Sequence, residues 1–537
     1  MPNSKNKRIY EVLAVFVLLL VAVVIRNTYL LQYEVRVPYY RIPIIDSAYY
    51  DDWAIRVAQG RGYGPMPFYM APLYPYVLAF IYKVFGHNFT IVYFFQEILG
   101  VLNVFLVYLI GRRLFGHAAG LIAGLLITLY APVVYLESKL LTETLAITLS
   151  LGSLLMLLRA MDKPTILKFL ATGVMLGLSA VCRPAALLTA TLMVLWLMWR
   201  KPVSRKFVAV MAAGIALAVL PVTTRNYLIG RDFALITTNG GICFAQANAP
   251  SATGVSTSLG GFSSALDTQQ QEEMAYASRE LGHRVTASES AAFWFKLALS
   301  AARDEPAKFA KLQLKKLAWS LHNREPGCSY SVYFEKTLVP ALRYLFVPFS
   351  LIAGSGLFGF LRSKRRESEL LAIQVISVYI TMIVFAVSSR YRAPAMPIIA
   401  IFAGFGVVEV MRSLITHHSS WRAITGVIAC LAAISAVSLI KYPQPLIIPG
   451  DTGNLGTAYV QSGNLDKGIF YLNKTLKMEP SALAYYNLAN ALLKKGRLDA
   501  AIPYFKKAVE LRPDYPKFQA ALALALLKQE ELRKHHP

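Results

Sequence analysis

Cysteine is scarce in this chain, which has four cysteines among 537 residues. Cys182 and Cys430 lie inside apolar runs, and we expect both to be inert core residues. Cys243 and Cys328 fall within one long loop, where a disulfide in an oxidising compartment and two separate thiols are both open interpretations. So few cysteines say little about the fold.

The N-terminus lacks the small-residue cleavage pattern of a secretory signal peptide. A basic stretch, "MPNSKNKR", is followed by the apolar run "VLAVFVLLLVAVVI", and many further apolar runs come after it. This arrangement indicates a retained signal anchor and argues against a segment that is removed.

Acidic residues are also few, because 30 Asp and Glu stand against 55 Lys and Arg and give a net charge of +25. In a soluble protein this excess would suggest a nucleic-acid partner. Here the basic residues cluster in short segments between apolar runs, which is typical of membrane topology. The pattern therefore excludes nucleic acid as the predicted partner.

Apolar residues, in contrast, are abundant: hydrophobic types make up 56% of the chain, and the mean hydropathy is +0.46. Repeated runs are long enough to cross ~30 Å of hydrocarbon. We predict an all-α polytopic transmembrane bundle of about eleven spans. They lie near residues 10–29, 92–110, 119–136, 142–158, 166–181, 184–199, 207–223, 338–361, 369–388, 395–411 and 422–440.

The short basic clusters fall on alternate connections between these spans, so all of them lie on one side, which the positive-inside rule makes cytoplasmic. They lie near residues 5–8, 112–113, 159–168, 200–206, 362–366 and 412–422. We therefore predict a multi-pass inner (cytoplasmic) membrane protein with a cytoplasmic N-terminus. The opposite, extracytoplasmic or periplasmic side would hold a first loop near 30–91, a long loop near 224–337 and the C-terminus. The short apolar segment 71–86, which contains two prolines, is predicted to be an interfacial or re-entrant helix.

After residue 445 the composition becomes that of a soluble domain. Two segments, starting at Asn454 and Asn487, align at an offset of 33 residues, with matching glycines at Gly463 and Gly496 and prolines at Pro480 and Pro513. This pattern resembles the tetratricopeptide repeat, in which we expect the glycines to let paired helices cross closely and the prolines to end the second helix. We predict a membrane domain at 1–445 and a repeat domain at 450–537. The repeats would either bind a protein partner or pack only against their own membrane domain.

Several ionisable residues lie at the predicted outer rim, where arginine is disfavoured. Ionisable groups at membrane depth are costly and tend to face a cavity or a pathway. Acids and arginines that gather on one face therefore suggest a site that binds an anion. The residues are Asp46, Asp51, Asp52, Glu137, Lys139, Glu143, Arg183, Arg225, Arg390 and Arg392.

Simpler interpretations are open for each of these residues. Asp46 would be the N-cap of a helix that begins at Ser47, and Asp51 and Asp52 would lie on a solvated helix face. Glu137 and Lys139 would form a local surface pair. Arg183 and Arg392 would extend to phospholipid headgroups.

The order of motifs resembles the GT-C membrane glycosyltransferases. The motifs are D-x-x-Y-Y-D-x-W-A from Asp46, "APLYPYVLAFIYKVFG", "GRRLFG", "LLTETLAI", "CRPAALL", "RNYLIG" followed by "TTNGG", and "SRYRAPAMP". The likeness covers about residues 8–440 and is greatest to the bacterial branch related to protein O-mannosyltransferases and aminoarabinose transferases (families 39 and 83). The resemblance implies an inverting transfer of a sugar from a polyprenyl-phosphate donor, on the extracytoplasmic side, to a hydroxyl of a lipid-linked glycan or a protein.

The resemblance also implies roles for individual residues. Asp46 matches the presumed general base, Asp51 stands in for a second acid that the family often has, and Glu143, or less closely Glu137, matches the acid of a later loop. A hydroxyl is a weak nucleophile and needs a base, whereas a phosphate leaving group needs cations or hydrogen bonds. For the donor phosphate we expect Arg390 first, then Arg225 and Lys139, with Arg183 and Arg392 as further choices. Around the acceptor and the sugar we expect Tyr49, Tyr50, Tyr74, Asn239 and Glu137.

No group of residues has the tight spacing of metal ligands, so we predict no obligatory metal, although Asp46, Asp51 and Glu143 are oxygen donors that a divalent ion accepts. Two other classes of protein remain as alternatives. A transporter or flippase would place its charges near the bilayer midplane and contain internal repeats, and the membrane part has no visible duplication. A non-catalytic assembly scaffold would use the repeat domain but would leave the acids and arginines at the outer rim without a role.

Overall fold

The computed structural model describes residues 4–250, 252–255, 266–327, 331–416, 420–442, 445–513 and 515–535. Within these residues the secondary structure is helical apart from one isolated bridge between Val255 and Val387. The chain divides into two compact units, residues 1–30, 45–328 and 340–443 on one hand and residues 31–44, 329–339 and 444–537 on the other. The predicted all-α fold class is confirmed.

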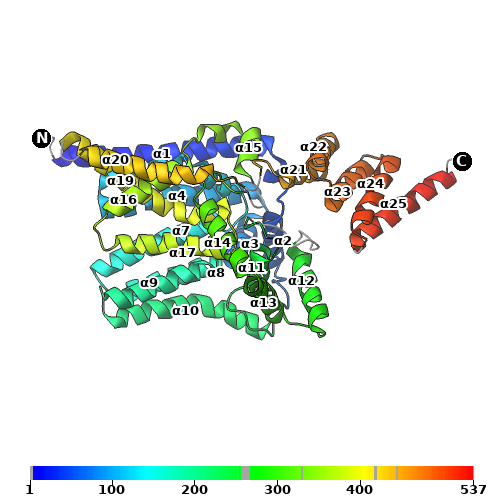
Figure 1. The fold of residues 1–537 in the computed structure, drawn as a ribbon, viewed down its shortest axis with the longest axis horizontal. Helices are drawn as coiled ribbons and strands as arrows, with labels where there is room; N and C mark the ends of the chain where they lie inside the picture. The colour runs from blue at the N-terminus through cyan, green and yellow to red at the C-terminus, as the bar shows by residue number, and fades with distance from the viewer. Residues whose placement is uncertain are drawn as a thin grey trace. The chain divides into compact units, whose positions relative to one another are not determined.

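The first unit holds the apolar helices (Figure 1). Its helices are most of α1 (Ser4–Arg36), α2 (Asp46–Ala58), α3 (Leu73–Phe85), α4 (Phe89–Phe115), α5 (His117–Thr128), α6 (Ala131–Glu137), α7 (Glu143–Asp162), α8 (Ile166–Cys182), α9 (Ala186–Arg200), α10 (Arg205–Leu228), α11 (Gly240–Asn248), α12 (Leu266–Leu281), α13 (Ala287–Asp304), α14 (Pro306–Ser320), α16 (Phe349–Arg362), α17 (Ser368–Val384), α18 (Ser389–Arg392), α19 (Met396–Thr416) and α20 (Ser420–Ala436). Short 3₁₀ turns lie at η2 (Pro340–Tyr344), η3 (Ala393–Ala395) and η4 (Val437–Leu439).

By length and composition, six helices of the described chain can cross a membrane, or seven if the pair α5 and α6, bent by 63°, counts as one span. Four further predicted spans coincide with α8, α9, α16 and α17, which are shorter apolar helices. The count of eleven therefore stays a prediction. The span predicted from residue 338 starts too early, because η2 and a short loop precede α16.

Glycine lets helices of the first unit pack closely. Gly173 on α8 faces α10 at Gly214, and a Cβ added to Gly173 would overlap the backbone oxygen of Met211. Without a hydrophobic drive between lipid-exposed helices, such small residues allow the van der Waals contact that holds the helices together.

The second unit contains the end of α1, η1 (Pro38–Tyr40), α15 (Val332–Leu338) and two helical hairpins with a final helix. The hairpins are α21 (Pro449–Gln461) with α22 (Leu465–Met478) and α23 (Ala482–Lys494) with α24 (Leu498–Leu511), and α25 (Pro516–His535) follows. Leu472, Leu488 and Phe505 form their core. Pro480 and Pro513 lie just beyond α22 and α24, as the repeat pattern predicted.

The role expected for the turn glycines is wrong. Gly463 and Gly496 have φ of 85° and 79°, a left-handed conformation that glycine adopts at little cost, and a Cβ at either position would meet open space. The close approach of α21 and α22 occurs instead at Gly456 and Gly468, whose added Cβ atoms would overlap neighbouring atoms of the hairpin.

Candidate active site

Three segments that are far apart in the sequence meet at Arg390. Its Nη1 donates a hydrogen bond to Oδ2 of Asp46, and its Nε donates to Oε1 of Glu143. Glu143 is 1% exposed, and Asp46 and Arg390 are each 9% exposed. One guanidinium group therefore holds two nearly buried carboxylates from α2 and α7.

Local sequence explains why these groups point to one place. Asp46 and Glu143 each lie in the first helical turn, of α2 and α7 respectively, where the free N–H groups and the helix dipole favour a carboxylate. Arg390 lies on the single turn α18, whose start is capped by the Ser388 hydroxyl accepting from the Arg390 backbone N–H. Two helix N-termini and one capped turn thus form the cluster.

The interpretation of Asp46 as an N-cap is wrong. Helix α2 begins at Asp46 itself, and its N-cap is Ile45, at φ 50° and without a side-chain cap. The Asp46 carboxylate bonds to Arg390, so it is committed to a tertiary contact and does not cap its own helix.

A second arginine joins the cluster from the end of α8. Arg183 donates from Nη1 to Oε1 of Glu143 at 3.2 Å, and its guanidinium lies 5.1 Å from the centre of the Tyr391 ring. Its side chain is 16% exposed. Arg183 and Tyr391 also line a small cavity of about 40 Å³ that continues along Ser150 and Gln374.

Tyr50 lies beside this cluster. It is 1% exposed, and its ring packs edge-on against Tyr74 with 5.5 Å between the ring centres. Burial raises the pKa of the Tyr50 phenol well above its usual value, although Arg390 acts in the opposite direction. Tyr50 therefore keeps its proton and can donate a hydrogen bond. The Tyr74 hydroxyl donates to Gln96 at 2.7 Å and is committed there.

The other acids of α2 are bound elsewhere. Asp51 accepts from Tyr82 at 2.7 Å and pairs with His87 at 2.9 Å. Asp52 pairs with Arg56 one turn later at 3.0 Å and is largely exposed, as expected for a solvated residue. Asp51 is therefore not brought to the Arg390 cluster.

Three more predicted site residues also have other partners. Tyr49 shares a hydrogen bond with Tyr63 at 3.0 Å. Arg225 donates to the backbone oxygens of Gly64 and Met66 and lies 4.3 Å from the centre of the Phe68 ring. Asn239 accepts from Thr237 at 3.1 Å.

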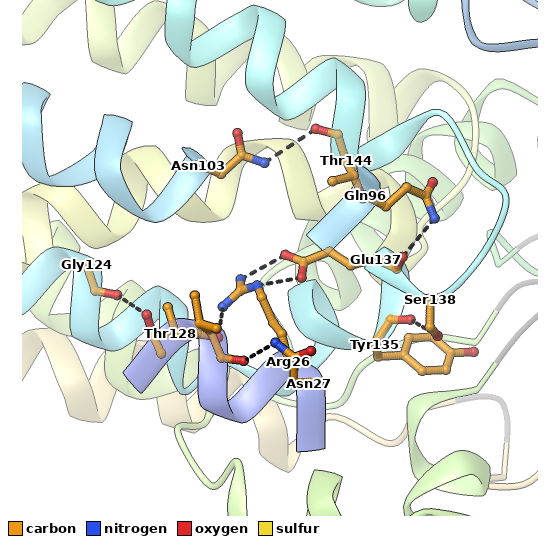
Figure 2. Close-up of polar contacts among 12 residues, drawn as sticks. Arg26, Asn27, Gln96, Asn103, Gly124, Thr128, Tyr135, Glu137, Ser138 and Thr144 are labelled. Carbon is orange, nitrogen blue, oxygen red and sulfur yellow. Dashed lines mark hydrogen bonds and ion pairs between the residues drawn. The ribbon is translucent and has the colours of Figure 1, made fainter. Parts of the chain in front are cut away.

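Glu137 and Lys139 are not a surface pair, and that interpretation is wrong. Both are buried, at 3% and 2% exposure. Figure 2 shows Glu137 bound by the guanidinium group of Arg26 from α1. Nε of Arg26 donates to Oε2 at 2.7 Å, and Nη2 donates to Oε1 at 2.9 Å. A bidentate guanidinium partner of this kind stabilises a buried carboxylate, and a lysine two residues away cannot provide it. The Lys139 ammonium contacts the Ser138 hydroxyl at 3.0 Å and lies 4.7 Å from the centre of the Tyr135 ring.

Arg392 does not extend to a lipid headgroup either. It is 1% exposed, pairs with Glu325 at 2.6 Å and lies 3.7 Å from the centre of the Phe349 ring. Its Nη atoms also donate to the backbone oxygens of Ser320, His322 and Arg324. Arg392 thus fixes the loop that follows α14.

Sequence reasoning missed Arg26, Glu325 and Tyr391. Arg26 had a visible signal, because it is a lone cation within the apolar run of α1. Glu325 and Tyr391 had none, since their roles depend on partners brought close by the fold. Among the described residues no three His, Cys, Asp or Glu side chains gather as metal ligands do. Cys328 lies outside the described residues, so its pairing with Cys243 stays open.

Comparison with known proteins finds a similarity over part of the chain. Residues 69–224 match the family model described as dolichyl-phosphate-mannose-protein mannosyltransferase. The matched segment contains Glu143 and Arg183, whereas Asp46 and Arg390 lie outside it. Residues 454–516 match the tetratricopeptide repeat. The resemblance to GT-C glycosyltransferases with a repeat tail is confirmed, and it supports a membrane glycosyltransferase.

Solved structures give a weaker likeness. The archaeal oligosaccharyltransferase AglB from Archaeoglobus fulgidus, in complex with an inhibitory peptide and a dolichol-phosphate, matches with a TM-score of 0.45 and 15% identity over 88% of this chain and 60% of that one. The same enzyme tethered to an acceptor peptide gives 0.45 and 15% over 87% and 59%. The chain thus spans about 60% of the length of these structures. No curated protein has a sequence that matches this chain.

Proposed function

We propose that this chain transfers a sugar, with inversion, from a polyprenyl-phosphate donor to a hydroxyl of a protein or glycolipid acceptor on the extracytoplasmic face of a membrane. One observation carries the proposal: Arg390 binds the Asp46 and Glu143 carboxylates together, beside Arg183. The family match over residues 69–224 supports it, since the name of that family includes a lipid-phosphate sugar.

In this proposal Asp46 is the general base. Oδ2 of Asp46 is bonded to Arg390, and this leaves Oδ1 to receive the proton of the acceptor hydroxyl. As the hydroxyl oxygen bonds to the anomeric carbon, the bond from that carbon to the phosphate oxygen breaks. The electron pair leaves with the polyprenyl phosphate, so the leaving group needs positive charge rather than a proton.

Arg183 is the better choice for the donor phosphate than Arg390. The Arg390 guanidinium is already bound by two carboxylates, whereas Arg183 forms an ion pair with Glu143 alone and lines a cavity. Glu143 then orients both arginines. Tyr50, which keeps its proton, is placed to donate a hydrogen bond to the sugar or the acceptor.

The test uses the purified full-length protein in detergent, a panel of labelled polyprenyl-phosphate sugars, and peptide and glycolipid acceptors. Asp46→Asn should reduce turnover by roughly 10²- to 10⁴-fold, which is the usual contribution of a general base. Asp52→Asn is the matched control, since Asp52 lies on the same helix, is exposed, and should leave turnover unchanged.

Turnover of Asp46→Asn at the wild-type rate would remove Asp46 as the base. No turnover of any donor by the wild-type protein would favour a transporter or a scaffold. The repeat domain is proposed to present or recruit a protein partner.

A further inference from the structure

A second cavity shares no lining residue with the Arg390 cluster. It has a volume of about 610 Å³ and is formed by the loop after α11, the end of α13, one face of α14 and the segment that follows η4. Its charged lining residues are Glu305, Lys308, Lys311, Lys315 and Lys441. Four lysines against one glutamate make the cavity attractive to an anion.

The lysines of α14 are arranged on one face of the helix. Lys308, Lys311 and Lys315 follow each other at spacings of three and four residues, so their side chains lie in one row. Lys308 pairs with Glu305 at 3.2 Å. Among the described residues, no acid forms an ion pair with Lys311, Lys315 or Lys441. Three cations that repel one another are thus available to a ligand.

The remaining wall contains Asn248 and Thr253 together with three large apolar side chains, Phe309, Leu312 and Trp319. Trp319 is 5% exposed, and its Nε1–H has no hydrogen-bond partner among the described residues. A ligand with an apolar part and a phosphate would satisfy both the wall and the lysines.

Buried hydrogen bonds from α14 fix one side of the cavity. Lys316, which is fully buried, donates to the side-chain oxygen of Asn248 at 2.7 Å and to the backbone oxygens of Ile383 and Phe385 at 3.2 and 3.0 Å. These contacts fix α14 against the end of α17. The cation row is therefore held in place before any ligand binds.

The position along the chain indicates the source of the ligand. Lys441 and Ile440, which line the cavity, follow directly after the apolar helix Trp421–Leu439, one of those able to cross a membrane. The cavity thus lies at an end of a membrane span, where lipid headgroups are. Lysines near such a surface attract anionic lipids by about 1 kcal/mol each.

We propose that this cavity binds the phosphate headgroup of an anionic phospholipid, with Lys311, Lys315 and Lys441 around the phosphate and the glycerol and first methylenes along Phe309, Leu312 and Trp319. The site is independent of sugar transfer at Arg390. Its experiment measures binding only, so its failure would leave the assay of Asp46→Asn unaffected.

The experiment is native mass spectrometry of the full-length protein in detergent, titrated with phosphatidylglycerol or, as a neutral control, phosphatidylcholine. The wild-type protein should retain one phosphatidylglycerol in preference to phosphatidylcholine. The double variant Lys311→Gln and Lys315→Gln should bind phosphatidylglycerol roughly 30-fold more weakly, from two lysines at about 1 kcal/mol each. The matched control, Lys296→Gln with Arg303→Gln, removes equal charge from α13 outside the cavity and should bind like the wild type.

Three results would overturn the proposal. Equal retention of phosphatidylcholine would mean that the cavity does not distinguish an anionic headgroup from a neutral one. Equal weakening by the α13 control would mean that attraction is spread over the surface. Displacement of phosphatidylglycerol by an equal concentration of inorganic phosphate would mean a site for free phosphate rather than for a lipid. Melting temperatures within a few degrees of the wild type establish that both variants are folded. If the double variant is unfolded, Lys441→Gln, which lies outside α14, is used for the same binding test.

Discussion

Arg390 and Arg392 lie two residues apart on the single turn α18, and both are buried, yet their guanidinium groups are bound in different ways. Arg390 contacts two carboxylates from the first turns of α2 and α7. Arg392 contacts one carboxylate, three backbone oxygens and an aromatic face. The first holds the two carboxylates of the proposed site together, and the second fixes the main chain.

The difference teaches how one short motif can serve two purposes. A guanidinium group bound by one carboxylate and three backbone oxygens holds the main chain, even though Nε of Arg392 has no hydrogen-bond partner among the described residues. A guanidinium group between two carboxylates holds both acids at one point. The variants below separate these purposes.

The largest effect is expected for Arg392→Ala. It would leave Glu325 buried with its guanidinium partner removed and free three backbone oxygens, and breaking a buried pair in this way costs about 3–5 kcal/mol. The midpoint of denaturation in detergent should fall strongly, while the activity of the remaining folded protein should fall less. An unchanged midpoint would show that the loop after α14 is held by other contacts.

Arg390→Gln should reduce activity more than it reduces stability. The variant keeps part of the hydrogen bonding but loses the charge between Asp46 and Glu143, so kcat should fall by roughly 10²- to 10³-fold, as for other lost electrostatic groups. Because Glu143 keeps Arg183 as a partner, the loss of stability should be smaller than for Arg392→Ala. Steady-state kinetics beside a denaturation curve check both, and a variant that is unstable but fully active per folded molecule would contradict this assignment.

The sequence predicts the helical class, the repeat tail and the set of rim residues from which the site is formed. Asp46, Glu143, Arg183 and Arg390 were recognisable because arginine is disfavoured at that rim and because the motif order resembles a family. The partners were not predictable. Glu137 pairs with Arg26 at a separation of 111 residues, and local spacing had suggested Lys139. Burial decides such pairs, since a desolvated carboxylate needs charged or hydrogen-bonding partners, and only the packed fold determines which guanidinium is near.

Arg183→Gln tests whether Arg183 is the arginine of the cluster that contacts the donor phosphate. If Arg183 contacts the donor phosphate, its loss should raise the KM for the donor by roughly tenfold, or about 1.4 kcal/mol, and change kcat less. Arg225→Gln is the comparison, because Arg225 is bound to backbone oxygens away from the cluster and should leave the KM for the donor unchanged. A larger increase in the KM for the donor with Arg225→Gln would indicate that Arg225, and not Arg183, contacts the donor phosphate.

The smallest effect concerns Glu273, a buried carboxylate that, unlike Asp46 and Glu143, has no cation partner among the described residues. It is 4% exposed and accepts from Tyr69 at 2.7 Å and Gln269 at 2.8 Å. Burial raises the pKa of Glu273 to about 7, against the lowering effect of these two bonds, and nearby Glu272 raises it further.

The folded protein therefore binds a proton at Glu273 more readily than the unfolded chain between about pH 4.5 and pH 7. The stability that this proton contributes is present below the unfolded pKa and is lost as the pH rises through the folded pKa. Glu273→Gln stays neutral and should remove this dependence. From pH 6 to pH 8 the wild-type protein should lose about 1.3 kcal/mol relative to the variant, since one unit between pH and pKa corresponds to about 1.4 kcal/mol. Denaturation midpoints at the two pH values measure the difference. A pH dependence that is equal in both proteins would mean that Glu273 is already ionised at pH 6 and that its two hydrogen bonds alone outweigh its burial.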